Sequence, residues 1–231
     1  MYENRLKEAL PRVREAIAGA LERAGRSEHV EIVAITKGHP ADAVLSAVRN
    51  GLRCCGENRA AELEAKVGAV GRHGAEWHFV GHLQRNKVRR ILPLVDLLHS
   101  VDSLRLAETL SAEAVRAGMT LRVLVQVNTS GEAAKGGFSA AEAVDAVARI
   151  AELPNLAVQG LMTMAPLDAE EAVLRSTFGR TRRLFDECAA VVPGFEARHL
   201  SMGMSNDFEV AVEEGSTMVR LGTILFGERR P

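Results

Sequence analysis

Lys37 is the residue of this chain whose type and surroundings best suit covalent chemistry. It directly follows the apolar, β-branched run of residues 32–36 and precedes Gly38. Such a run is typical of a strand buried on both faces, which would pack the lysine stem and direct its amine above the sheet. Because burial disfavours the ammonium form, it lowers the pKa of a lysine and makes the amine a nucleophile toward aldehydes. The alternative is a solvated lysine at a strand end, which is the commoner arrangement.

Polar and glycine residues also follow other predicted strands. They are Gly56-Glu57-Asn58, the segment 78–84, the segment 128–137 and the segment 162–166. In a closed barrel of parallel strands the carboxyl ends converge on one face, where active sites form. This gathering of polar ends favours a site that contains Lys37.

The segments after the last two predicted strands carry hydroxyl residues and glycines beside the start of a helix. Barrels often bind a phosphate there, between backbone amides and hydroxyls. Such a cup could be formed by the hydroxyls of Ser201, Ser205 and Thr223 and the amides of Gly203 and Gly222. Turn glycines and helix caps explain the same residues without a ligand.

Arg220 lies inside the last predicted strand, between two apolar neighbours. An inward-pointing arginine needs a partner, because an unpaired buried charge is costly. Glu57 or Asp207 could be that partner, and the alternative is a hydrogen-bond acceptor on a ligand.

The elements that would position these residues alternate strictly between strand and helix. Candidate strands cover residues 31–37, 53–57, 76–80, 97–101, 121–128, 157–164, 197–202 and 218–226. Helical patterns lie near 41–50, 58–70, 84–93, 103–117, 140–152, 169–190 and 206–214, after an N-terminal helix at about 2–25. This order predicts an α/β fold, a single-domain (β/α)8 TIM barrel over residues 1–231 with the extra N-terminal helix packed outside. A doubly wound open sheet is the alternative, but no Gly-x-Gly-x-x-Gly turn follows the first strand.

Composition excludes several classes of protein. The 231 residues carry a formal net charge of −1, which gives no general attraction to nucleic acid or anionic membranes. No apolar run is long enough to span a bilayer, and the first residues begin a charged helix rather than a signal peptide. The three cysteines, Cys54, Cys55 and Cys188, lack metal-ligand spacing, so we expect no metal site and a reducing cytoplasm.

Other chemically interesting side chains have simpler explanations. His78 and His82 are expected on a strand and its loop rather than on a helix, which favours packing or capping over a metal pair. The basic stretch 85–90 is typical of a solvated face that could attract an anionic partner. Four methionines are expected to line the barrel and its pocket: Met162, Met164, Met202 and Met204.

Taken together, the motifs resemble those of the YggS/PROSC family of pyridoxal 5′-phosphate (PLP) binding proteins, which act in PLP homeostasis. The similarity runs from about residue 31 to the C-terminus. It includes Thr36-Lys37, Gly56-Glu57-Asn58 and the segments 76–87, 128–137 and 200–227. Each motif alone is modest, but the set in this order is specific.

The resemblance implies a barrel like the N-terminal domain of alanine racemase, with PLP held as a Schiff base on Lys37. It implies that Arg220 faces the pyridine nitrogen and that Asn58 lines the pocket. The cofactor-binding residues expected on this basis are Lys37, Asn58, Ser201, Gly203, Met204, Ser205, Arg220, Gly222 and Thr223. His39 and Arg59 replace a lysine and an aromatic residue of many members, which casts doubt on a cofactor-transfer role at position 39.

We expect a PLP-binding protein that buffers or delivers the cofactor, with no strong activity and no catalytic residues. An arginine at the ring nitrogen disfavours its protonation and makes the ring a weaker electron sink. A two-base racemase needs acid/base groups on both faces of the substrate carbon. Alanine racemase takes one from a tyrosine of a separate domain, whereas the only tyrosine here is Tyr2 and the chain ends at Pro231.

Two alternatives remain open from the sequence. One is a PLP-dependent amino-acid racemase with His82 or a water as second base. The other is an interaction protein that binds a macromolecule through residues 85–90, with PLP as a sensor ligand. We expect a cytoplasmic monomer that binds PLP and serves PLP-dependent apoenzymes, and we expect no nucleic acid or membrane partner.

Overall fold

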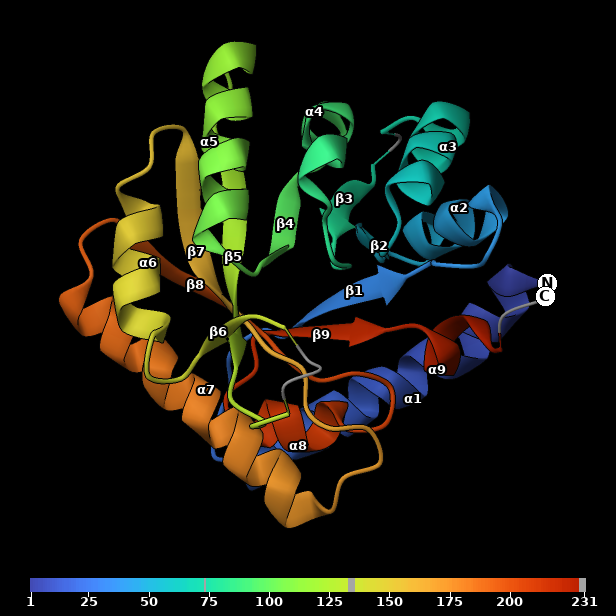
Figure 1. The fold of residues 1–231 in the computed structure, drawn as a ribbon. Coiled ribbons are helices and arrows are strands. Elements are labelled where there is room, and N and C mark those ends of the chain that lie inside the picture. Colours follow the sequence, from blue (N-terminus) through green and yellow to red (C-terminus); the bar gives the residue numbers. More distant parts are fainter. Residues whose placement is uncertain (73, 133–135, 229–231) are drawn as a thin grey trace.

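A barrel of parallel strands forms the centre of the computed structural model, which describes residues 1–72, 74–132 and 136–228. Its strands are β1 (Glu31–Ile35), β2 (Cys54–Glu57), β3 (Glu76–Phe79), β4 (Leu97–Val101), β5 (Leu121–Asn128), β7 (Leu156–Met162), β8 (Phe195–Ser201) and β9 (Met218–Leu221). Each strand pairs in parallel with the next, and β9 pairs with β1 to close the ring (Figure 1). The two-residue β6 (Phe138–Ser139) pairs with β5 in a separate sheet. The predicted (β/α)8 barrel is confirmed.

Helices surround the barrel on the outside. They are α1 (Tyr2–Arg23), α2 (Ala41–Arg49), α3 (Ala60–Val70), α4 (Val88–Ile91), α5 (Leu104–Ala117), α6 (Ala143–Ala151), α7 (Glu171–Val191), α8 (Phe208–Glu213) and α9 (Thr223–Phe226). In α1 the buried positions Leu6, Leu10, Val13 and Ile17 recur every three or four residues, so one face is apolar. That face packs α1 against α2, α8 and α9 outside the βα repeat, as predicted (Figure 1). None of the helices that the structure describes has the length and apolar composition of a membrane span.

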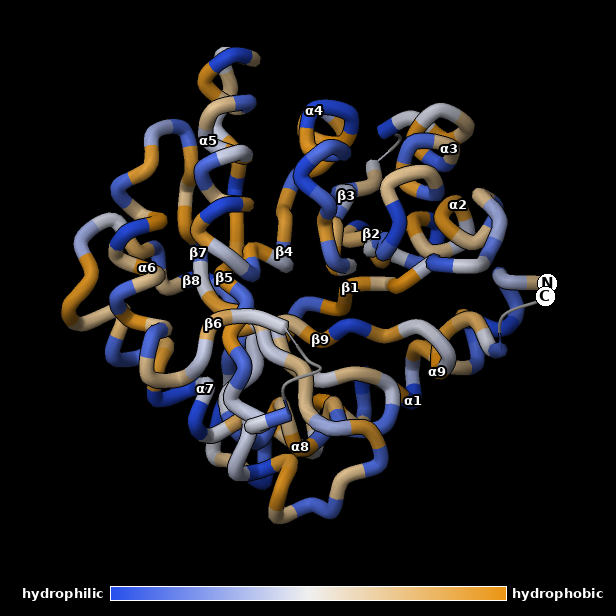
Figure 2. Tube along the Cα trace, viewed as in Figure 1, coloured by the Kyte–Doolittle hydropathy of each residue, from blue (hydrophilic) through white to orange (hydrophobic). Residues whose placement is uncertain are grey.

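Two apolar layers follow from the alternation of side chains along each strand. In β1, Ile32 and Ala34 belong to the cluster between strands and helices, whereas Val33 and Ile35 belong to a smaller cluster inside the barrel. The neighbouring Cys54 and Cys55 divide in the same way, with Cys54 inside. Figure 2 shows the corresponding mixture of hydrophobic and hydrophilic residues along the surrounding helices.

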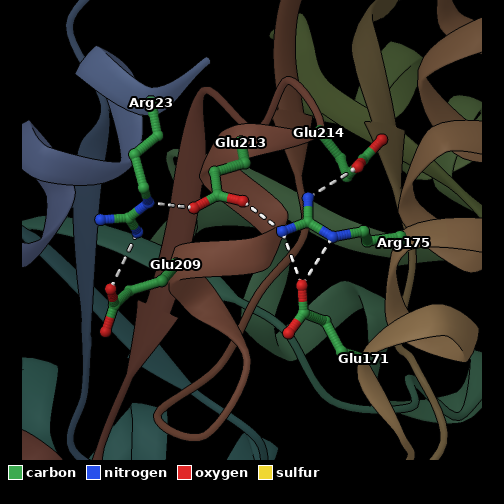
Figure 3. Close-up of polar contacts among 6 residues, drawn as sticks. All are labelled: Arg23, Glu171, Arg175, Glu209, Glu213 and Glu214. Carbon is green, nitrogen blue, oxygen red and sulfur yellow. Dashed lines mark hydrogen bonds and ion pairs between the residues drawn. The ribbon is translucent and has the colours of Figure 1, made fainter.

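A network of ion pairs on the outer surface ties three helices together (Figure 3). Glu213 of α8 accepts from Arg23 of α1 at 2.6 Å and from Arg175 of α7 at 2.5 Å. Arg23 also pairs with Glu209, and Arg175 with Glu171 and Glu214. Glu213 is the central member, and only 12% of its side chain is exposed.

The structure corrects several predicted boundaries. The last strand ends at Leu221 rather than at Phe226, because Gly222 leaves the extended conformation (φ −120°, ψ −81°) and α9 follows. The first strand ends at Ile35, two residues before Lys37. The predicted helix 84–93 divides into two 3-10 turns, Arg85–Lys87 and Leu92–Leu94, on either side of α4.

Candidate functional site

The carboxyl ends of the barrel strands surround a cavity of about 320 Å³. Its lining includes seven of the expected cofactor-binding residues: Lys37, Asn58, Met204, Ser205, Arg220, Gly222 and Thr223. They come from the ends of β1, β2, β8 and β9, which are distant in sequence but adjacent in the barrel. These strand ends are thus brought together as predicted, whereas no described residue of the segment 128–137 is among the lining.

The structure places the other two expected residues, Ser201 and Gly203, behind this lining. The Ser201 side chain is completely buried in the barrel. Gly203 has φ +96°, and a Cβ atom there would lie 2.6 Å from the Cβ of Ala211. A glycine is therefore required at this position, because α8 approaches the main chain closely. The Gly203 carbonyl accepts from the amide of Arg220 at 2.9 Å.

The main chain on both sides of Lys37 is held by hydrogen bonds. The Thr36 carbonyl accepts from the buried ammonium of Lys66 at 2.6 Å, and the Gly38 amide donates to Glu62 at 2.8 Å. Lys66 also forms a buried ion pair with Glu57, which accepts from the Thr36 hydroxyl at 2.5 Å. Burial raises the pKa of Glu57, opposed by the bonds from Lys66 and Thr36. The Lys37 turn is therefore a fixed part of the cavity wall.

The N-terminal helix contacts the same turn through His39. The hydroxyl of Tyr2 lies 3.2 Å from His39 Nδ1, and the two rings meet edge to face. Phe226 of α9 packs against both rings, with centroids 5.5 Å from His39 and 6.2 Å from Tyr2. His39 thus joins the Lys37 turn to α1 and α9, a structural role that sequence analysis did not anticipate.

Arg220 is 5% exposed and is held mainly by neutral oxygens. Its guanidinium donates to the carbonyl and hydroxyl of Ser201, at 2.8 and 2.6 Å, and to the carbonyl of Thr163 at 2.8 Å. Of the two carboxylates considered as partners, Glu57 bonds to Lys66, whereas Asp207 lines the cavity. Burial lowers the pKa of Arg220 to about 10, and the Asp207 charge opposes this shift. Arg220 therefore remains a cation at neutral pH.

A chain of buried hydrogen bonds continues from Ser201 through the inside of the barrel. The Ser201 hydroxyl lies 3.0 Å from His99 Nδ1, and His99 Nε2 lies 3.0 Å from His78 Nδ1. Burial lowers the pKa of His78 to about 3 and that of His99 well below its ordinary value. Both imidazoles are therefore neutral at pH 7. Sequence analysis treated His78 as a packed residue and missed His99, although a histidine within the apolar strand β4 was a signal.

Hydroxyls and amides line the side of the cavity formed by β8, β9 and α9. The Ser205 hydroxyl accepts long hydrogen bonds from the amides of Gly222 and Ile224, at 3.4 and 3.5 Å. Thr223 beside them is exposed, and the Met204 amide donates to Asp207. Hydroxyls and backbone amides are donors of the kind that bind phosphate oxygens.

The loop after β7 also lines the cavity, through residues 166–169. Sequence analysis placed the segment 162–166 at this mouth but missed residues 167–169. Within this loop Asp168 has a positive φ of 51°, unusual for a residue other than glycine. The Pro-Leu-Asp turn that opens this loop was the available signal.

Two residues considered in the sequence lie elsewhere. His82 bonds to Asp102 at 2.8 Å and lines a separate depression with Lys87 and Arg90. Arg90 of the basic stretch donates to Glu64 at 2.7 Å. Lys135 lies outside the described residues.

Comparison with known proteins gives one consistent family. Residues 10–230 match the family model "Alanine racemase, N-terminal domain". The curated "Pyridoxal phosphate homeostasis protein" of Aquifex aeolicus (strain VF5) is 41% identical over 224 residues, covering 96% of this chain and 98% of that protein.

Solved structures of PipY from Synechococcus elongatus PCC7942 are also similar. The structure without PLP is 34% identical with a TM-score of 0.87, covering 96% of this chain and 100% of PipY. The structure with PLP bound is 35% identical with a TM-score of 0.81, covering 91% and 100%. This chain therefore belongs to the pyridoxal phosphate homeostasis protein family, whose barrel is that of the alanine racemase N-terminal domain.

Proposed function

We propose that this protein binds PLP in the cavity at the carboxyl ends of its strands and acts in PLP homeostasis by buffering or delivering the cofactor. The observation that carries the proposal is that Lys37 and the buried Arg220 line one cavity of about 320 Å³. The names of its relatives and the PipY structure with PLP bound support it.

The residues of the cavity match the chemical groups of PLP. A volume of about 320 Å³ is within the range of small-ligand sites. Lys37 supplies the amine that would condense with the aldehyde, releasing water and forming a Schiff base. Ser205, Thr223 and the Gly222 amide supply phosphate partners, and Asn58 and Met204 supply further walls. Ser201 and Gly203 would not contact PLP in this proposal; they lie behind the cavity lining and hold Arg220 in place.

The position of Arg220 favours a protein that binds PLP over an enzyme that uses PLP to transform a substrate. A fixed cation at the pyridine nitrogen disfavours protonation of that nitrogen, and PLP supplies less carbanion stabilisation in that state. Neither of the side chains considered as a second base for racemisation is placed to act in the cavity, because His82 lines a different depression and Tyr2 bonds to His39. We therefore propose binding without strong catalysis.

The finer features of the proposal concern the cellular setting. The free cysteines agree with a reducing cytoplasm, and we propose a monomer there. The position of the cavity at the mouth of the barrel agrees with transfer of PLP to apoenzymes. Sedimentation measurements test the monomer, and activation of an apoenzyme by the PLP-loaded protein tests delivery.

The deciding experiment is the visible absorption spectrum of the protein with added PLP, before and after borohydride. We expect a band in the wild type that is lost on reduction, with the label recovered on Lys37 by peptide mapping. Lys37→Ala should lose the band and the label. Lys7→Ala, which changes an exposed lysine of α1, should keep both. A band that persists in Lys37→Ala would contradict the assignment, and production of D-amino acids by the wild type would favour the racemase.

A further inference from the structure

The amino ends of the barrel strands surround a second cavity, of about 250 Å³. Glu31, Cys54 and Glu76, the first residues of β1, β2 and β3, line it together with His78 and His199. It shares no lining residue with the cavity that contains Lys37. The two cavities therefore lie at opposite mouths of the barrel, and this one is not part of the proposed PLP site.

Three side chains at this mouth form a compact set of metal ligands. One ligand atom each from Cys54, Glu76 and His78 lies within 4.8 Å of the others. Strand register explains the cluster, because Cys54 pairs with Glu76 across β2 and β3 and His78 follows two residues later on the same face. Ligands on adjacent strands leave no short spacing motif, which is why the sequence suggested no metal site.

The orientation of each ligand suits a shared ion. Glu76 Oε1 accepts from Arg122 at 3.5 Å, while Oε2 lies 3.7 Å from the Cys54 sulfur. His78 Nδ1 is occupied by His99, which leaves Nε2 available. Histidine ligands usually have their second nitrogen fixed by such a hydrogen bond, which orients the ring and sets the tautomer. The Nε2 lone pair is free of a proton in the tautomer whose Nδ1–H donates to His99.

We propose that Cys54, Glu76 and His78 form a binding site for a divalent transition metal, Zn²⁺ or a metal of similar preference. A thiolate, an imidazole and a carboxylate together suit Zn²⁺ rather than Mg²⁺ or Ca²⁺, which prefer oxygen ligands alone. Water completes the tetrahedral coordination in this proposal, and His199 and Glu31 line the same cavity.

Metal binding at this site releases a proton. Coordination by Cys54 as a thiolate breaks its S–H bond as the metal–sulfur bond forms, and the proton passes to solvent.

Cobalt(II) is the direct probe of this site, because a thiolate ligand gives it a strong near-ultraviolet absorption. Tag-free protein treated with a chelator should develop this band with one equivalent of Co²⁺, and one equivalent of Zn²⁺ should remove it. The band should be lost in Cys54→Ser and kept in Cys55→Ser, whose neighbouring thiol lies in the outer layer. Glu76→Gln and His78→Gln should weaken binding by about 10- to 100-fold or more, the loss that even outer-shell changes cause.

The proposal is wrong if the wild type binds no Co²⁺ or binds it without the thiolate band. It is also wrong if Cys54→Ser keeps the band. Circular dichroism of each variant identifies any that fail to fold, and Glu76→Gln then remains as a test, because its side chain is 46% exposed.

Discussion

Arg220 donates two hydrogen bonds to a single residue, Ser201, at 2.8 Å to its carbonyl and 2.6 Å to its hydroxyl. The guanidinium is thus fixed in the cavity wall by neutral oxygens. Neutral acceptors orient an arginine without cancelling its charge. The carboxylate whose charge acts on Arg220, that of Asp207, lines the same cavity.

Arg220→Ala should weaken PLP binding without necessarily abolishing the covalent adduct, because Lys37 is untouched. It should also lower the free energy of unfolding by about 2–3 kcal/mol, since the buried oxygens of Ser201 and Thr163 lose their donors. PLP titration and urea unfolding measure the two effects. The exposed Arg85→Ala is the control, and equal PLP affinity in wild type and Arg220→Ala would contradict the role of the cation.

Lys37→Ala should remove the adduct while changing the free energy of unfolding by no more than about 1 kcal/mol. The reason is that the main chain on both sides of Lys37 is held by Lys66 and Glu62, and these bonds do not involve the truncated side chain. Thermal unfolding without PLP measures this. Collapse of the variant would show that loss of the adduct reports on folding rather than on the amine.

Lys66→Met should destabilise the protein by about 3–5 kcal/mol, because it leaves the buried Glu57 carboxylate without its cation. The double variant Lys66→Met/Glu57→Leu should recover much of this loss, since neither charge is then buried. Urea unfolding of the two single variants and the double variant provides the cycle. Additive losses would mean that the two residues do not act as a pair.

The two neutral histidines predict a specific loss of stability in acid. The pKa of His78 falls from 6.5 when unfolded to about 3 when folded, and that of His99 shifts in the same direction. Between these pH values the unfolded chain binds the protons and the folded chain does not, so stability falls as the pH falls. Each histidine contributes a slope of about 1.4 kcal/mol per pH unit.

Unfolding free energies from pH 7 to pH 4 test this slope. His99→Asn should have a shallower dependence than the wild type, because one of the two buried imidazoles is absent. His29→Asn, which changes a histidine that is 84% exposed in its side chain, should leave the slope unchanged. Parallel curves for the wild type and His99→Asn would refute the explanation.

Glu213→Gln should lower the melting temperature more than Glu209→Gln. Glu213 bonds to Arg23 and Arg175 with 12% of its side chain exposed, whereas Glu209 bonds to Arg23 and is 49% exposed. Exposed pairs contribute little and are screened by salt. Calorimetry in low and high salt measures both differences, and a larger effect at Glu209 would contradict this ranking.

The sequence was sufficient for the barrel because its strands are marked by their own residues. Strand β5 spans Leu121–Asn128 as predicted, since a near-continuous apolar run suits a strand covered by helices. The end of β9 was predicted wrongly because Thr223 and Ile224 favour strands. The contacts of Ser205 with the amides that follow Leu221 are tertiary, and local propensity does not contain them.

The candidate site was only partly accessible from the sequence for the same reason. Strand ends indicated that Lys37 and Arg220 would meet at one mouth, and both line the cavity. Whether a residue faces the cavity or lies behind it depends on the packing of neighbouring strands. Ser201 therefore looked like a phosphate ligand but lies beneath Arg220, and its bond to His99 joins residues 102 positions apart.

The hydrogen bonds of the two buried histidines share one donor-to-acceptor direction along the inside of the barrel. Each neutral imidazole carries one N–H, so the bonds from His78 through His99 to Ser201 point either all one way or all the other. Reversing only one bond would set two donors or two lone pairs against each other in a buried place. The chain therefore behaves as a two-position switch, and a group that fixes the tautomer of His78 at one mouth also decides whether Ser201 donates or accepts beside Arg220.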